Sequence, residues 1–202
     1  MELLRRGAGG ARQVALLPGA WNPPTRAHLA LAEAARAYVQ EVLLALPGVF
    51  PHKGIEEVDL DTRLAWLSTL AATRDWVGVA TGGSGLFIEM VRGLKASAPA
   101  VEQVYIACGS DAAQRFLDWD YGQAPGVEEQ LREFTLLVAP RGAPFAVPER
   151  LRAFVHPLEM EGWDEYSSTE LRERIRRGEG WAHLAPEEIG EELERTYRGT
   201  RK

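Results

Sequence analysis

The chain of 202 residues lacks several features that mark secreted and membrane-spanning proteins. Its single cysteine, Cys108, excludes an internal disulfide and a multi-cysteine zinc site, so nothing in the chain requires an oxidising compartment. Its best apolar run, from Val42 to Phe50, is broken by Pro47 and Gly48 and is shorter than the roughly 18 residues that span a bilayer. The first 13 residues are basic and flexible in character and lack the apolar core of a secretory signal. We therefore expect a cytoplasmic protein with no membrane partner.

Positive charge is scarce as well. The chain has 23 basic and 29 acidic side chains, which gives a net charge of -6 and disfavours general binding to nucleic acid by neutralisation of phosphates. Any site for an anion must therefore be local. Hydrophobic residues at 46% and charged residues at 26% are ordinary for a folded protein, and the length predicts one domain over residues 1–202 that can bury a core.

Short apolar segments alternate with helical patterns along the chain. We expect buried strands at Gln13–Leu17, Glu41–Leu46, Trp76–Ala80, Gln103–Cys108, Phe134–Ala139 and Leu151–His156. We expect helices between them at Arg26–Tyr38, Asp61–Thr73, Leu86–Lys95 and Asp111–Leu117, and two final helices at Ser168–Arg177 and Pro186–Tyr197. This order predicts an α/β fold, a doubly wound parallel sheet with a small helical carboxyl-terminal segment.

In such a sheet, ligands bind beyond the carboxyl ends of the strands, so the loop after the first strand is a candidate site. Two prolines stiffen this loop before a helix start, whose backbone amides suit a phosphate. Thr25 can be the N-cap of that helix, which places His28 in the first turn, facing the positive helix end. The alternative is a half-buried histidine on the core face, because Leu31 and Ala35 follow at helical spacing.

The last loop carries a second signal. Ser167 and Glu170 have the spacing of a capping box, and Arg172 follows in the same helix. Hydroxyls, amides and a guanidinium that converge at a helix start are suited to a polyphosphate. The alternative is a surface helix whose acidic and basic side chains form solvated pairs.

Two motifs at opposite ends of the chain resemble those of the nucleotidylyltransferases. GAWNPPTRAH, Gly19–His28, resembles their amino-terminal signature, and SSTELR, Ser167–Arg172, resembles their Ser-Ser-Thr-x-x-Arg motif. Within that superfamily, the chain looks most like the nicotinate or nicotinamide mononucleotide adenylyltransferases. The further matching segments are PHK (Pro51–Lys53), DTRLAWL (Asp61–Leu67), GSDAAQRFLDW (Gly109–Trp119) and VAPRG (Val138–Gly142).

The chain also departs from that pattern. Thr25 stands where the usual bacterial motif has its first histidine, and Ala27 stands where it has glycine. The family's Tyr-Thr-x-Asp-Thr-Leu stretch, which helps to read the pyridine ring, corresponds to LFIEMV, Leu86–Val91, which has neither threonine. The acceptor is therefore left open between the two pyridine mononucleotides and another phosphorylated metabolite, and a nucleotide-binding module with weakened catalysis is a further alternative.

The resemblance implies a Rossmann-like fold and adenylyl transfer from ATP to the phosphate of nicotinate or nicotinamide mononucleotide, with release of pyrophosphate, in NAD biosynthesis. It implies Mg²⁺ bound with ATP and predicts no oligomeric state. The catalytic groups it implies are His28, Lys53 and Arg172. The residues implied for ATP are Gly19, Ala20, Trp21, Asn22, Thr25, His28, Gly109, Asp111, Ser168, Thr169 and Arg172, and those implied for the acceptor are Trp119 and Lys53.

Some of these residues also have simpler interpretations. Asp111 is equally well placed to cap the helix that follows Ser110. Trp119 can serve as a stacking platform or merely pack against its neighbours. Lys53 can belong to a solvated loop. Cys108, at the end of an apolar strand with no histidine near it in sequence, is most simply a buried small hydrophobe, and we assign it no role.

Overall fold

The computed structural model describes residues 1–7, 9–49, 57–122, 125–140, 145–160, 162–163 and 166–198. Its strands are β1 (Glu2–Arg5), β2 (Gln13–Pro18), β3 (Glu41–Leu46), β4 (Val77–Thr81), β5 (Gln103–Gly109), β6 (Thr135–Ala139) and β7 (Val155–Pro157). Its α-helices are α1 (Arg26–Ala35), α2 (Leu60–Ala72), α3 (Phe87–Ser97), α4 (Ser110–Asp118), α5 (Val127–Gln130), α6 (Ser168–Arg177) and α7 (Gly190–Arg198). Two 3₁₀ turns are η1 (Glu149–Leu151) and η2 (Glu187–Ile189).

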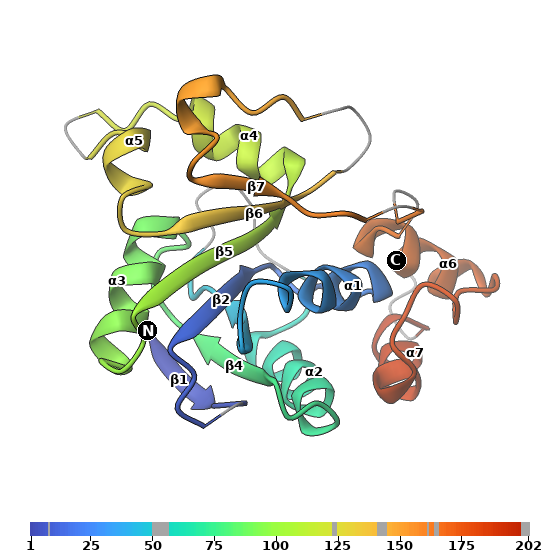
Figure 1. The fold of residues 1–202 in the computed structure, drawn as a ribbon. Helices are drawn as coiled ribbons and strands as arrows, with labels where there is room; N and C mark the ends of the chain where they lie inside the picture. Colours follow the sequence, from blue (N-terminus) through green and yellow to red (C-terminus); the bar gives the residue numbers. More distant parts are fainter. Residues whose placement is uncertain are drawn as a thin grey trace.

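The strands form one sheet in the order β1-β4-β3-β2-β5-β6-β7. Strands β2 to β7 pair in parallel, and the predicted doubly wound, Rossmann-like architecture is confirmed (Figure 1). The chain moves outward from β2 through β3 to β4 and then returns to β5 on the other side of β2. This reversal creates a crevice at the carboxyl ends of β2 and β5, where ligands bind in such folds.

Both faces of the sheet are buried, which explains why its strands are continuously apolar. In β2, Val14 and Leu16 pack on one face, while Ala15 and Leu17 pack on the other, because side chains alternate along a strand. One core lies beneath α1, α2, α6 and α7, and the second lies beneath α3 and α4. The two cores hold the strand ends, and therefore the loops that follow them, in fixed positions.

The amino-terminal segment is better ordered than its composition predicts. Residues Glu2–Arg5 form β1, which pairs antiparallel with β4 at one edge of the sheet. The reason is a buried carboxylate: Glu41 is fully buried, accepts the Gly7 N–H at 2.6 Å and pairs with Arg6 at 2.5 Å. A buried carboxylate needs such partners, so it holds the segment in place.

Three other expected segments differ in extent. The strand expected at Leu151–His156 is wrong over its first four residues, because Leu151 ends η1 and the Phe154 N–H donates back to the Leu151 carbonyl at 2.9 Å, which makes a turn. The first predicted helix ends at Ala35, since residues 36–38 bond three residues back instead of four. The final helix is α7, preceded by η2 after Pro186. Within the described ranges, each helix is too short or too polar to cross a membrane.

Candidate active site

The loop after β2 is held against β3 by two hydrogen bonds to one carbonyl. The Gly19 N–H and the Trp21 indole N–H both donate to Ala45 O, at 3.1 and 2.9 Å. A Cβ atom at Gly19 would lie 3.0 Å from the indole ring, a tight contact that favours glycine at this position. Trp21 has a positive φ of 53° and its side chain is 1% exposed. The Trp21 ring belongs to the core and supports the loop from within, so only its backbone is left for the predicted contact with ATP, which stays a prediction.

Thr25 is the N-cap of α1 and His28 lies in its first turn, as predicted. The Thr25 backbone N–H donates to His28 Nδ1 at 3.0 Å, and Thr25 Oγ1 lies 2.8 Å from the same nitrogen. A backbone N–H can only donate, so Nδ1 accepts, and the neutral ring carries its proton on Nε2. The imidazole packs on Trp21, with ring centroids 5.0 Å apart. His28 is half-buried, and because Trp21 belongs to the core, this position fits both the predicted site and the alternative of a half-buried histidine on the core face.

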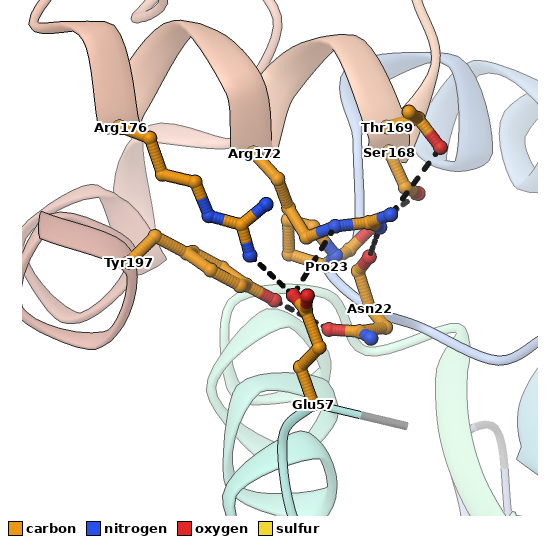
Figure 2. Close-up of polar contacts among 8 residues, drawn as sticks. All are labelled: Asn22, Pro23, Glu57, Ser168, Thr169, Arg172, Arg176 and Tyr197. Carbon is orange, nitrogen blue, oxygen red and sulfur yellow. Dashed lines mark hydrogen bonds and ion pairs between the residues drawn. The ribbon is translucent and has the colours of Figure 1, made fainter. Parts of the chain in front are cut away.

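The first and last loops meet, and Figure 2 shows the contacts. Helix α6 begins with Ser167 as its N-cap, whose Oγ accepts the Glu170 N–H at 3.0 Å, as the capping-box spacing predicts. The Ser168 hydroxyl donates to Pro23 O at 2.7 Å. Arg172 Nη1 donates to Asn22 O at 2.5 Å. Residues about 150 positions apart therefore form one polar corner at the start of α1.

Helix α7 adds a contact that sequence reasoning missed. The Tyr197 hydroxyl donates to Asn22 Oδ1 at 2.5 Å, and both side chains are buried, at 1% and 5% exposure. The only signal for Tyr197 was its place in a helical pattern, which identifies a core position but no partner. The bond ties the end of the described chain to the loop after β2.

The basic side chains of α6 fall into two groups. Arg174 and Arg177 pair with glutamates four residues earlier, Glu170 and Glu173, at 2.6 and 3.1 Å, which agrees with the alternative of solvated pairs. Arg172 differs, because it is only 20% exposed and its guanidinium also lies 3.3 Å from Thr169 Oγ1. The predicted phosphate-binding arginine is therefore oriented by the site itself.

A cavity of about 260 Å³ opens beyond the carboxyl ends of β2, β3 and β5, on the side of α3 and α4. Trp119, the C-cap residue of α4, is 43% exposed and forms part of its wall. Arg115 is the one charged residue among the described lining residues. The lining residues are Pro18, Gly19, Ala20, Pro47, Gly85, Leu86, Phe87, Cys108, Ala112, Arg115, Phe116, Trp119 and Tyr121.

The segment after β5 corrects one prediction. Helix α4 begins at Ser110 with Gly109 as its N-cap, so Asp111 lies in the first turn and is not the cap. Its carboxylate lies 3.6 Å from Arg115, one turn further along. Cys108 is buried at 4% exposure, and burial raises the pKa of its thiol to about 12. This supports the interpretation of Cys108 as a small buried hydrophobe.

Lys53, predicted for catalysis and acceptor binding, lies outside the described residues, as does the rest of the Pro51–Lys53 motif. In the part of the chain that the structure describes, no three His, Cys, Asp or Glu side chains gather as metal ligands.

Comparisons with known proteins agree with this architecture. Residues 16–174 match the family model described as cytidylyltransferase-like, and a search of curated proteins finds no match. The chain is similar to the solved structure of Plasmodium falciparum nicotinic acid mononucleotide adenylyltransferase complexed with NaAD, with TM-score 0.67, 14% identity and coverage of 93% of this chain and 98% of that one. For the same enzyme complexed with APC, the TM-score is 0.65 and the identity 13%, with the same coverages.

Proposed function

Because this chain belongs to the cytidylyltransferase-like family, we propose that it transfers an adenylyl group from ATP to the phosphate of nicotinate or nicotinamide mononucleotide. The products are pyrophosphate and the dinucleotide, a step of NAD biosynthesis in the cytoplasm. The observation that carries the proposal is the contact between the loop after β2 and the start of α6, which joins His28 and Arg172 to one polar corner.

The phosphate end of the proposed site has the donors that ATP requires. His28 would donate from Nε2, since its Nδ1 is occupied by the Thr25 N–H. The backbone N–H groups of Ser168 and Thr169 lie in the first turn of α6, where the helix has no internal acceptors for them. Arg172 adds a fixed positive charge. We propose that Gly19, Ala20 and Asn22 shape this end, with Thr25 holding His28.

The acceptor end is the cavity lined by Trp119. Its aromatic walls, Phe87, Phe116 and Tyr121, suit a planar ring, and stacking on the indole would contribute about 0.5–1.5 kcal/mol beyond its buried area. Arg115 is positioned to attract an anionic ring substituent, which favours the acid form of the mononucleotide over the amide form. Gly109, at the end of β5, and Asp111, in the first turn of α4, are our candidates for contact with the adenosine.

The proposed chemistry needs no protein nucleophile. A phosphate oxygen of the mononucleotide attacks the α-phosphorus of ATP in line, one P–O bond forms, and the bond to the β-phosphate oxygen breaks, so that pyrophosphate leaves. The protein's task is to align two anions and to stabilise developing negative charge, to which His28 and Arg172 would contribute. Mg²⁺, which prefers oxygen ligands and retains water, would be held mainly by the phosphates and would neutralise part of their charge. Lys53 remains a predicted partner in this role.

The direct test is pyrophosphate release. The chain, ATP and Mg²⁺ are mixed with nicotinate mononucleotide, and in a second series with nicotinamide mononucleotide, and pyrophosphate and dinucleotide are measured over time. We expect release with at least one of them and a preference for the acid form. Absence of release with both would reject the proposal for pyridine mononucleotides.

A second candidate keeps the chemistry and changes the acceptor. Leu86 and Phe87 line the cavity where the resembled family has residues that read the pyridine ring, and both are apolar. A panel of phosphorylated metabolites assayed for pyrophosphate release would identify such an acceptor. Tight ATP binding in calorimetry with no product from any acceptor would instead favour a nucleotide-binding module.

A further inference from the structure

Two arginines of α6 converge on a single carboxylate that comes from outside the helix. Arg172 and Arg176 are four residues apart and therefore lie on one face of α6. The Glu57 carboxylate, from the segment that leads into α2, pairs with both through the same atom, Oε2 (Figure 2). The contact joins Arg176 to a residue 119 positions away.

This arrangement differs from the other ion pairs of the helix. Arg174 and Arg177 each have a glutamate one turn earlier on α6, whereas the residue one turn before Arg176 is Arg172. Like charges at this spacing repel one another and destabilise a helix unless an anion lies between them. Glu57 supplies one negative charge against two positive charges, so the position favours an anion of higher charge.

The Glu57 carboxylate also leaves one hydrogen-bond donor of Arg172 unsatisfied. Arg172 Nε is buried and has no hydrogen-bond partner among the described residues, because Glu57 Oε2 lies 3.7 Å away. The other nitrogens of the same guanidinium contact Asn22 O and Thr169 Oγ1, so the group is held in place by the site. A phosphate has three terminal oxygens in place of the two of a carboxylate and can meet two guanidinium groups at once.

Glu57 can be displaced at low cost. Its side chain is 55% exposed, so water can solvate the carboxylate when it leaves the arginines, and exposed ion pairs of this kind are weak. Arg176 is 31% exposed, and its guanidinium lies over the Tyr197 ring at 5.9 Å, which keeps the group near the site when Glu57 departs.

We propose that the Glu57 carboxylate occupies a phosphate position between Arg172 and Arg176, so that ATP must displace it, and that Arg176 is a further phosphate-binding residue. The inference rests on the proposed function, because it takes the corner formed by Asn22 and Arg172 as the triphosphate site. It has an unusual consequence: removal of an acidic side chain strengthens nucleotide binding.

The test is titration calorimetry with two probes, Mg²⁺-ATP and pyrophosphate. Glu57→Gln and Glu57→Ala should each tighten both dissociation constants about two- to fivefold, the range of one exposed ion pair. Arg176→Gln should weaken both by a similar factor. In the double variant with Glu57→Gln and Arg176→Gln, the gain from Glu57→Gln should shrink, since the two side chains act on one another.

The matched control is Glu173→Gln. It also removes one negative charge, but at a position on α6 that pairs with Arg177. Glu173→Gln should tighten the two dissociation constants less than Glu57→Gln does. Equal tightening by both variants would mean that any lost negative charge near the site strengthens binding, and this would overturn the inference. It is also overturned if the folded Glu57 variants bind both probes no more tightly than the unchanged chain. When that chain turns over ATP and a mononucleotide, the proposed function survives such a failure. Failure of the unchanged chain and all Glu57 variants to bind either probe would remove the proposed function together with the inference.

Discussion

The two ends of the candidate site are built in opposite ways. The phosphate end is polar and depends on contacts between distant segments, such as the bond between Asn22 and Tyr197. The acceptor end is an apolar cavity whose walls come from the strand ends, the loop before α3, and α4 with the residues that follow it. The phosphate end orients charged and polar groups before a ligand arrives, whereas the acceptor end offers shape and aromatic surface. We therefore expect substitutions at the first to reduce turnover and substitutions at the second to change acceptor affinity.

Replacing His28 should show the largest difference between the two ends, as a loss of turnover without a loss of acceptor affinity. His28→Ala removes a donor whose orientation is fixed by Thr25, and loss of one aligned donor costs about 2.7–4 kcal/mol in the barrier. We expect kcat to fall about 100- to 1,000-fold while the KM of the acceptor changes little, measured by pyrophosphate release. His156→Ala, which removes an imidazole stacked on Tyr38, is the control and should retain turnover. Full activity of His28→Ala would show that the imidazole takes no part.

Replacing Tyr197 tests whether α7 supports the phosphate end. Tyr197→Phe leaves the buried Asn22 Oδ1 without this donor, which costs about 1–3 kcal/mol. We expect a lower melting temperature and a raised KM for ATP, with the KM of the acceptor nearly unchanged. Tyr38→Phe, at a ring that packs on His156, serves as the control. Equal changes in the two KM values would mean that the bond stabilises the whole fold and has no particular effect on the phosphate end.

Replacing Trp119 tests the acceptor end. Trp119→Ala removes the proposed stacking platform, and the stacking alone, about 0.5–1.5 kcal/mol, corresponds to an acceptor KM at least about two- to tenfold higher. The KM for ATP, measured on the same preparation, should stay constant and is the internal control. A larger change in the KM for ATP than in that of the acceptor would place the indole at the wrong end of the site.

The last prediction concerns the reactivity of Cys108, which lines the cavity. Burial raises the pKa of its thiol to about 12, and alkylation requires the thiolate. At pH 8 the native thiol is almost entirely protonated, so iodoacetamide should label the folded chain slowly and the unfolded chain rapidly, as followed by mass spectrometry. The labelling rate of the folded chain should rise about tenfold with each pH unit and level off only near pH 12, because it follows the fraction of thiolate. Equal rates for the two states at pH 8 would contradict the burial of this group.

The sequence predicted the elements whose signals are local. The bounds of β3, Glu41–Leu46, follow from an apolar run, and the start of α6, at Ser168, follows from a serine cap. The N-cap role of Thr25 was predicted for the same reason. Such signals reside within a few residues, so a single chain is enough to read them.

The features that sequence reasoning missed depend on partners far away in the chain. The order of β1 comes from the burial of Glu41, and the role of Tyr197 comes from Asn22, which are contacts that no spacing predicts. The core position of Trp21 was missed because the motif marks a loop residue, while its positive φ turns the ring inward onto Gly19. The walls of the cavity likewise become visible only when the loops are placed together.

The central claim is that the loop after β2 and the start of α6 bind one triphosphate together. The most direct measurement is a crystal structure of the chain with a non-hydrolysable ATP analogue and Mg²⁺. The account predicts the triphosphate between the His28 imidazole and the first turn of α6, with Arg172 in contact with it. A triphosphate bound elsewhere, with neither His28 nor Arg172 within hydrogen-bond distance of a phosphate oxygen, would contradict it.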